Sequence, residues 1–243
     1  MDAISFADYK LFCDDLSRIC LEKRTIINTL NPHSFCLAEN DETFRRALKD
    51  ADILLPDGVG IVWACRLLTN RSISRISGMD VFRSLLKRIS VEAEPARRRI
   101  FFLGASPQTL KKIKDRVFKE YPSIELEYYS PPYREKFSTL DRKNMVEAVQ
   151  MFKPHVLFVG MTAPKQEKWV YENHEELQAK VICSIGAVFD YYAGTIKRPG
   201  PFWRRIGLEW LIRFLREPKR LWRRNLISGP HFVLKVLKLK LAS

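Results

Sequence analysis

The chain has 243 residues, of which 46% are hydrophobic, enough for one well-buried domain and a smaller appendage. Its 42 lysines and arginines outnumber 28 acidic residues, giving a formal net charge of +14. Such an excess indicates an acidic partner: a nucleotide, a nucleic acid or an anionic membrane. The start, MDAISFADYK, lacks the apolar segment of a signal peptide, and no apolar run approaches the roughly 18 residues of a membrane span. We therefore expect a cytoplasmic protein.

The cysteine pattern agrees with this expectation. The cysteines are odd in number, and their spacing matches no known set of metal ligands. We expect reduced thiols, as in other proteins of the cytosol. The five residues are Cys13, Cys20, Cys36, Cys65 and Cys183.

Apolar runs that end in turn residues recur along the chain, and each is followed by a stretch with helical periodicity. They are TIINTLNP (25–32), ADILLPDG (51–58), RRIFFLGASP (98–107), HVLFVGMTAP (155–164) and KVICSIGAV (180–188). SIELEYYSPPY (123–133) indicates a further strand. This alternation predicts an α/β fold: a Rossmann-like, largely parallel sheet with helices on both faces. Between the runs, residues 39–51 and 106–122 fit amphipathic helices, the second capped by Ser106 with Pro107 in its first turn.

Ligands of open α/β sheets bind beyond the carboxyl ends of the strands. The sequence places Asp57, within LLPDGVG, directly after a strand and beside a glycine that lets the backbone approach a ligand. Asp-Gly is also a common turn sequence. At this point Asp57 can be interpreted either as part of an ordinary turn or as a general base.

Phosphate and metal motifs are weak or absent. FLGASP has one glycine of a nucleotide-binding turn, but the chain contains neither GxGxxG nor the Walker lysine motif. KDADIL contains a DxD pair, but it precedes its strand, so Asp50 and Asp52 should lie at the edge opposite Asp57. We predict no metal and no cofactor.

The basic charge is concentrated at the end of the chain. Residues 194–243 contain thirteen basic and two acidic residues. Aromatic and apolar residues at helical spacing form a stripe over residues 202–214 that includes Trp203, Trp210 and Phe214. We expect Pro218 and Gly229-Pro230 to divide the segment into two or three short helices. It fits either a helical hairpin packed on the core or an interfacial helix on an anionic membrane. We predict a core over residues 1–194 and, over residues 195–243, a basic amphipathic helical appendage that contacts the membrane.

Six segments, in order and at the same spacing, resemble the WecG/TagA/CpsF family of bacterial glycosyltransferases. They are TLNPHSF, ADILLPDGVGIVWA, RISGMDVF, FFLGASPQTL, VGMTAPKQEKW and IGAVFDYYAGTIKRPGPFWRRIGLEWLIRFLREPKR. The resemblance runs from about residue 25 to residue 225. It implies inverting, metal-independent transfer of a hexose-type sugar from a UDP-sugar to a polyprenyl-diphosphate-linked sugar at the inner face of the cell membrane. It places such enzymes in cell-surface polysaccharide or teichoic acid synthesis.

The resemblance also assigns residues in the core. Asp57 would be the base that deprotonates the acceptor hydroxyl. Thr29 and Asn31 would line the sugar pocket beside it. Arg75 and Gln166 would contact donor or acceptor.

Four further residues follow from the same comparison. Asp190 would lie near the nucleotide. The appendage over residues 195–243 would complete the active site. Its residues Arg213, Arg220 and Arg223 would close over the diphosphate, where a planar guanidinium can replace a metal ion. The donor sugar stays open among N-acetylmannosamine, its uronic acid and glucose.

Other functions compete with this interpretation. A nucleic-acid-binding protein would use the basic tail, but the tryptophans and the nearly neutral first 193 residues argue against nucleic acid as partner. A non-catalytic, membrane-associated adaptor that binds a nucleotide-sugar is the main alternative. An oxidoreductase is a further alternative, but the chain lacks the dinucleotide-binding motif that such an enzyme would contain. A homo-oligomer is compatible with the amphipathic appendage.

Overall fold

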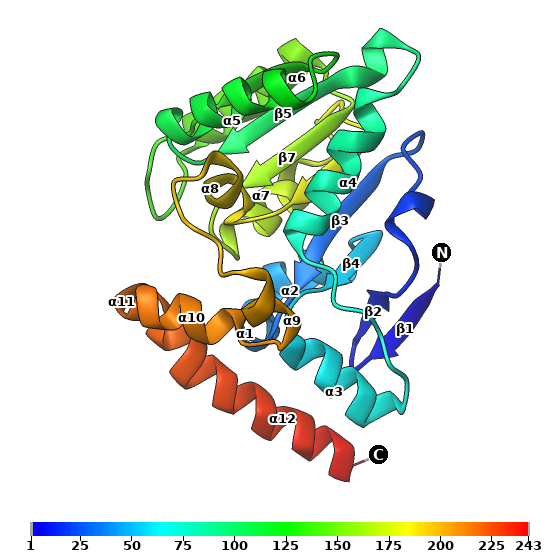
Figure 1. Cartoon of the computed structure of the whole chain (residues 1–243), viewed down its shortest axis with the longest axis vertical. Coiled ribbons are helices and arrows are strands. Elements are labelled where there is room, and N and C mark those ends of the chain that lie inside the picture. Colours follow the sequence, from blue (N-terminus) through cyan, green and yellow to red (C-terminus); the bar gives the residue numbers. More distant parts are fainter. Residues whose placement is uncertain (1, 243) are drawn as a thin grey trace.

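The computed structural model describes residues 2–242, which form a twisted eight-stranded sheet covered by helices (Figure 1). The strands are β1 (Ala3–Phe6), β2 (Tyr9–Phe12), β3 (Thr25–Leu30), β4 (Ile53–Pro56), β5 (Arg99–Gly104), β6 (Glu125–Tyr129), β7 (Val156–Gly160) and β8 (Val181–Ser184). Their order is β1-β2-β4-β3-β8-β7-β5-β6, and only the β1–β2 pair is antiparallel. The predicted Rossmann-like, largely parallel sheet is confirmed.

Helices connect the parallel strands and form the end of the chain. Those before residue 194 are η1 (Leu16–Arg18), α1 (Pro32–Ala38), α2 (Glu42–Lys49), α3 (Val59–Thr69), α4 (Gly78–Ser90), η2 (Pro95–Arg98), α5 (Pro107–Glu120), α6 (Thr139–Phe152), α7 (Lys165–Asn173) and α8 (Val188–Ala193). The appendage contains α9 (Pro201–Arg205), α10 (Glu209–Arg216), α11 (Pro218–Trp222), the π-helical turn η3 (Arg223–Ser228) and α12 (Gly229–Leu241).

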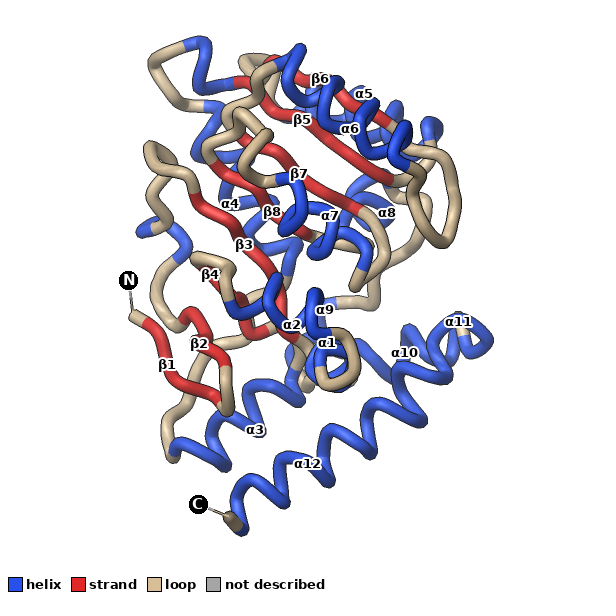
Figure 2. Tube along the Cα trace, turned by 180° about the vertical axis from the view of Figure 1, so that it is seen from behind, coloured by secondary structure: helices blue, strands red, loops and turns tan. Residues whose placement is uncertain are grey.

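The apolar runs became strands because helices cover both sheet faces. Every residue of β4, β7 and β8 is buried. Helices α4, α5 and α8 pack on one face around Phe82 and Phe102, and α6 and α7 on the other around Val149 and Trp169. Figure 1 views the sheet from the side of α4 and α8, and Figure 2 from the side of α7. This two-sided burial explains why these strands lack polar alternation.

Capping side chains set where several helices begin. The Ser106 hydroxyl accepts the Thr109 N–H at 3.2 Å, and Pro107 occupies the first turn of α5, both as predicted. Asp41 caps α2 by accepting the Phe44 N–H at 3.0 Å. The five cysteines are not bonded to one another, and three of them, Cys36, Cys65 and Cys183, are buried.

Two strands at the start of the chain were not expected. β1 and β2 form an antiparallel hairpin, and Leu11 of β2 pairs with Leu54 of β4. Their buried residues join a hydrophobic cluster with α1, α2 and α3. The hairpin extends the sheet at the β4 edge.

The last helix of the appendage packs on that same cluster. Phe232 and Val236 of α12 are buried there, and the Phe232 ring makes an edge-to-face contact with Phe35 of α1 at 5.3 Å. In Figure 1, α12 (red) crosses beneath α1 and α3. No helix of residues 2–242 is long and apolar enough to cross a membrane.

The appendage departs from the expected helix boundaries at two points. The apolar stripe predicted over residues 202–214 divides at Gly207, where φ is +78° between α9 and α10. The break expected at residues 229–230 is absent, because η3 continues directly into α12, with Pro230 as the second residue of α12. The boundary expected at Pro218 is confirmed.

Candidate active site

The register of β3 and β4 brings Asn31 and Asp57 to one edge of the sheet. Leu30 at the end of β3 pairs with Pro56 at the end of β4, so the residues that follow them, Asn31 and Asp57, lie side by side. The Asp57 N–H donates to the Leu30 carbonyl at 2.8 Å. Gly58 follows with φ at +96°, a conformation that side chains disfavour, and α3 begins at Val59. The strand–turn–helix path therefore holds Asp57 at the carboxyl edge.

Thr29 and Asn31 lie beside this turn. Thr29 is half-buried on β3, next to Leu55 in the register. The Asn31 side-chain oxygen caps α1 by accepting the N–H groups of His33 at 3.0 Å and Ser34 at 3.1 Å. Its NH₂ group is therefore the part that remains for a ligand. The predicted sugar-pocket role of both residues stays a prediction.

Charged groups from core and appendage surround Asp57. Burial raises the pKa of its carboxyl group, and nearby Glu209 adds to this effect. Arg224, Arg75 and Arg213 act in the opposite direction, because their positive charges favour the carboxylate. A carboxylate with a raised pKa is a better proton acceptor than an exposed one, as a general base requires.

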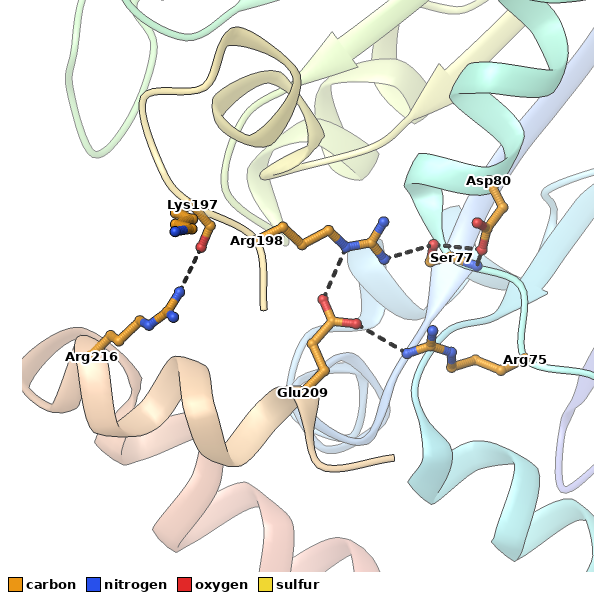
Figure 3. Close-up of polar contacts among 7 residues, drawn as sticks. All are labelled: Arg75, Ser77, Asp80, Lys197, Arg198, Glu209 and Arg216. Carbon is orange, nitrogen blue, oxygen red and sulfur yellow. Dashed lines mark hydrogen bonds and ion pairs between the residues drawn. The ribbon is translucent and has the colours of Figure 1, made fainter. Parts of the chain in front are cut away.

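Arg75 meets the appendage through Glu209 (Figure 3). The Arg75 guanidinium donates from Nη1 to Glu209 Oε2 at 3.2 Å, and Arg198 donates from Nε to Glu209 Oε1 at 3.2 Å. Arg198 also reaches the Ser77 hydroxyl at 3.4 Å. These contacts join the loop before α4, the segment before α9 and the start of α10.

The three predicted appendage arginines have different surroundings. Arg213 is half-buried, with its guanidinium 5.3 Å from the Tyr191 ring centroid. Arg220 of α11 is exposed and pairs at 2.5 Å with Glu217, the residue that precedes this helix. Arg223 is exposed and stacks on neighbouring Trp222 at 5.4 Å. Of these arginines, Arg213 is among the main charges that favour the Asp57 carboxylate.

Sequence reasoning missed Arg224 and Arg198. Arg224 is half-buried; loss of water contact lowers its pKa, and the negative charge of Asp57 opposes that change. It lies in the π-helical turn, which has more residues per turn than an α-helix. The α-helical spacing of residues therefore does not predict which face of the turn Arg224 occupies. Arg198 lies in an irregular segment, where no periodicity exists to identify its direction.

Gln166 joins the loops after β7 and β8. Its side-chain oxygen accepts the Met161 and Gly186 N–H groups, both at 3.1 Å, and its nitrogen donates to Glu167 at 2.8 Å. Its side chain is buried, so its visible contacts position these loops. Asp190 lies in the first turn of α8 and accepts the Thr195 hydroxyl at 3.2 Å. Ligand contact by Gln166 and Asp190 stays a prediction.

Candidate metal ligands lie elsewhere. The Asp52 carboxylate accepts the N–H of Ile26 at the start of β3, so the DxD segment occupies the amino edge, as predicted. Within residues 2–242, one group of side chains is close enough to hold a metal ion: Cys36, Glu39 and His231. There Glu39 already binds His231 at 2.6 Å and Lys235 at 2.8 Å, which joins α1 to α12.

The fold and the site define a Rossmann-like protein whose sheet edge presents a carboxylate among guanidinium groups, a combination suited to group transfer on phosphorylated substrates. The profile of the glycosyl transferase WecG/TagA/CpsF family matches residues 2–243, and the chain belongs to this family. The resemblance noted from the motifs is confirmed, and the chain is a glycosyltransferase.

Similar proteins carry a more specific name. The chain is 32% identical to the N-acetylglucosaminyldiphosphoundecaprenol N-acetyl-beta-D-mannosaminyltransferase of Bacillus subtilis strain 168, over 93% of this chain and 85% of that protein. The Bacillus spizizenii enzyme of the same name is also 32% identical, over 100% of this chain and 92% of its own length. The Staphylococcus aureus MRSA252 enzyme of that name is 28% identical, over 88% and 80%.

Proposed function

We propose that this chain is an inverting, metal-independent hexosyltransferase. It moves a hexose-type sugar from a UDP-sugar to a polyprenyl-diphosphate-linked sugar in cell-surface polysaccharide or teichoic acid synthesis. The names of the relatives favour N-acetylmannosamine as the sugar and N-acetylglucosaminyl-diphosphoundecaprenol as the acceptor. The observation that carries the proposal is the carboxylate of Asp57 at the carboxyl edge, with Arg75, Arg213 and Arg224 around it.

The proposed chemistry is a single displacement. The acceptor hydroxyl oxygen forms a bond to the anomeric carbon while the bond from that carbon to the phosphate oxygen of UDP breaks. Asp57 accepts the hydroxyl proton, and the electron pair of the broken bond stays on the UDP diphosphate. In this proposal, the half-buried Arg213 and Arg224 stabilise this charge, since one guanidinium group can donate two parallel hydrogen bonds to phosphate oxygens.

The appendage surface supports action on a membrane-bound acceptor. Large apolar side chains are exposed on it, including Phe202 at 65%, Trp210 at 46% and Leu215 at 66%. Exposed basic residues lie in the same segment, for example Arg216 on α10 and Lys219 on α11. Each base near an anionic surface adds about 1 kcal/mol of attraction, and five or six would give roughly 5 kcal/mol. We propose that the protein binds the inner face of the cell membrane through this surface.

Product analysis tests the proposal. The purified full-length chain, in EDTA, is given a series of UDP-hexoses and a prenyl-diphosphate-linked N-acetylglucosamine. We expect one donor to release UDP only when the acceptor is present, and NMR of the product to show an inverted anomeric centre. UDP binding without transfer of any donor would favour the adaptor. A retained configuration would contradict the single displacement.

A further inference from the structure

Glu209 is placed differently from an ordinary surface glutamate. It is the first residue of α10, and its carboxylate binds Arg75 through one oxygen and Arg198 through the other. Its side chain is only 12% exposed, and those of Arg198 and Arg75 are 16% and 27% exposed. Figure 3 shows it between the two guanidinium groups. A shielded carboxylate that binds two cations from separate segments fixes their spacing more firmly than an exposed pair would.

Arg198 is also held from a second side. Its guanidinium lies 6.0 Å from the Tyr191 ring centroid, and Arg213, one turn along α10 from Glu209, approaches the same ring at 5.3 Å. The Ser77 hydroxyl accepts a further N–H of Arg198 at 3.4 Å. Arg198 is therefore oriented by a carboxylate, a ring and a hydroxyl group.

Both arginines keep donors for a ligand. Arg75 uses Nη1 for Glu209, and Arg198 uses Nε and Nη2. Within residues 2–242, no hydrogen bond occupies Nε or Nη2 of Arg75, or Nη1 of Arg198. A planar guanidinium can bind a carboxylate on one side and a phosphate oxygen on the other.

The charges around Asp57 match one chemical class of ligand. Arg75, Arg198, Arg213 and Arg224 face two carboxylates, those of Asp57 and Glu209. This leaves two positive charges in excess. A diphosphate with an ester on each end carries two negative charges, and both a nucleotide-sugar and a lipid-diphosphate sugar contain such a group.

We propose that Glu209 is a positioning residue that holds Arg75 and Arg198 as a pair of guanidinium groups binding a substrate diphosphate. Arg198 is thereby a binding residue beyond those predicted from the sequence. The inference rests on the proposed function, because it assumes diphosphate substrates. It also accounts for a carboxylate within the basic appendage.

Binding measurements on full-length variants test this assignment. Glu209→Gln and Arg198→Gln are titrated separately with UDP and with a short-chain prenyl diphosphate linked to N-acetylglucosamine. Glu42→Gln is the matched control, because Glu42 also lies in the first turn of a helix and binds two arginines, Arg45 and Arg46, but with 53% of its side chain exposed.

We expect both test variants to raise the Kd for at least one ligand about tenfold, as loss of a charge-assisted phosphate contact should. The control should bind like the natural protein. A rise for UDP alone assigns the pair to the donor, and a rise for the prenyl diphosphate alone assigns it to the acceptor. The double variant should lose less than the product of the two single effects, since Glu209 acts partly through Arg198.

Other outcomes would overturn the inference. Unchanged Kd values for both ligands in Glu209→Gln, with transfer by the natural protein intact, would refute it and leave the proposed function standing. Loss of binding in Glu209→Gln that Arg198→Gln does not share would show that Glu209 only supports the appendage. Binding of both ligands by Arg198→Lys with unchanged Kd values would contradict the proposed role of the Arg198 guanidinium group, because lysine supplies the charge without its planar set of donors. Failure of the natural protein to bind either diphosphate would instead refute the proposed function.

Discussion

The packing of α12 against the core can be tested by truncating one side chain, that of Phe232. Phe232 is 1% exposed and lies edge-to-face with Phe35 of α1, whose ring also contacts Phe6 and Tyr9. Phe232→Ala removes a fully buried ring from a cluster that draws on α1, α3, the hairpin and α12. Substitutions of this kind cost about 3–5 kcal/mol, and the lost ring pair places this one near 4 kcal/mol.

Urea unfolding of the full chain, followed by circular dichroism, measures this difference. We expect a loss of about 4 kcal/mol in the free energy of unfolding and a melting temperature lower by roughly 10 °C. Phe202→Ala is the control, because its ring lies on the same appendage with 65% of its surface exposed, and it should change stability by less than about 0.5 kcal/mol. Equal effects of the two substitutions would refute the docking of α12 on the core.

Three further predictions concern burial, packing and membrane contact. Burial raises the pKa of Glu167 to about 7, so the folded protein retains a proton that the unfolded chain releases from about pH 4.5 upward. The free energy of unfolding should therefore fall between pH 4.5 and 7 by at most about 3 kcal/mol. In urea titrations, Glu167→Gln should remove this part of the pH dependence. Gly160→Ala would place a Cβ 2.2 Å from the Phe189 ring and should cost about 1–3 kcal/mol by the same assay. Changing both Trp210 and Leu215 to alanine should weaken flotation with phosphatidylglycerol vesicles about tenfold, because both side chains are exposed on α10.

Each of these predictions has its own control or contrary result. An unchanged pH dependence in Glu167→Gln would show that this carboxyl group ionises as it would in water. Gly200→Ala serves beside Gly160→Ala, because a Cβ at Gly200 meets nothing within 4 Å. Met151→Ala, at an 85% exposed site on α6, is the control for flotation. If the α10 variant floats as well as this control, the membrane surface lies elsewhere.

The strands and the sheet edge were predictable because they depend on local patterns. Apolar runs that end in turns identified β3, β4, β5, β7 and β8, and parallel pairing then required their carboxyl ends to share one edge. The β1–β2 hairpin was missed. Its strands have four residues each, and their apolar positions are too few to show a period.

The appendage was predictable in composition but not in geometry. The concentration of arginine and tryptophan identified the segment, but Gly207 and the π-helical turn rotate its faces in ways that an ideal helix does not reproduce. Arg224 therefore faces Asp57, while Arg223 lies on Trp222. Which arginine reaches the half-buried Asp57 depends on tertiary packing, and the spacing of residues along the sequence does not predict it.

The role of Asp57 is the central claim, and Asp57→Asn tests it most directly. Amide replaces carboxylate at nearly equal size, so proton acceptance is lost while the fold and the nearby arginines remain. Single-turnover sugar transfer in EDTA should fall at least about hundredfold, as loss of a general base predicts, with the Kd for UDP within about threefold of the natural value. Transfer at the natural rate by Asp57→Asn would contradict the account.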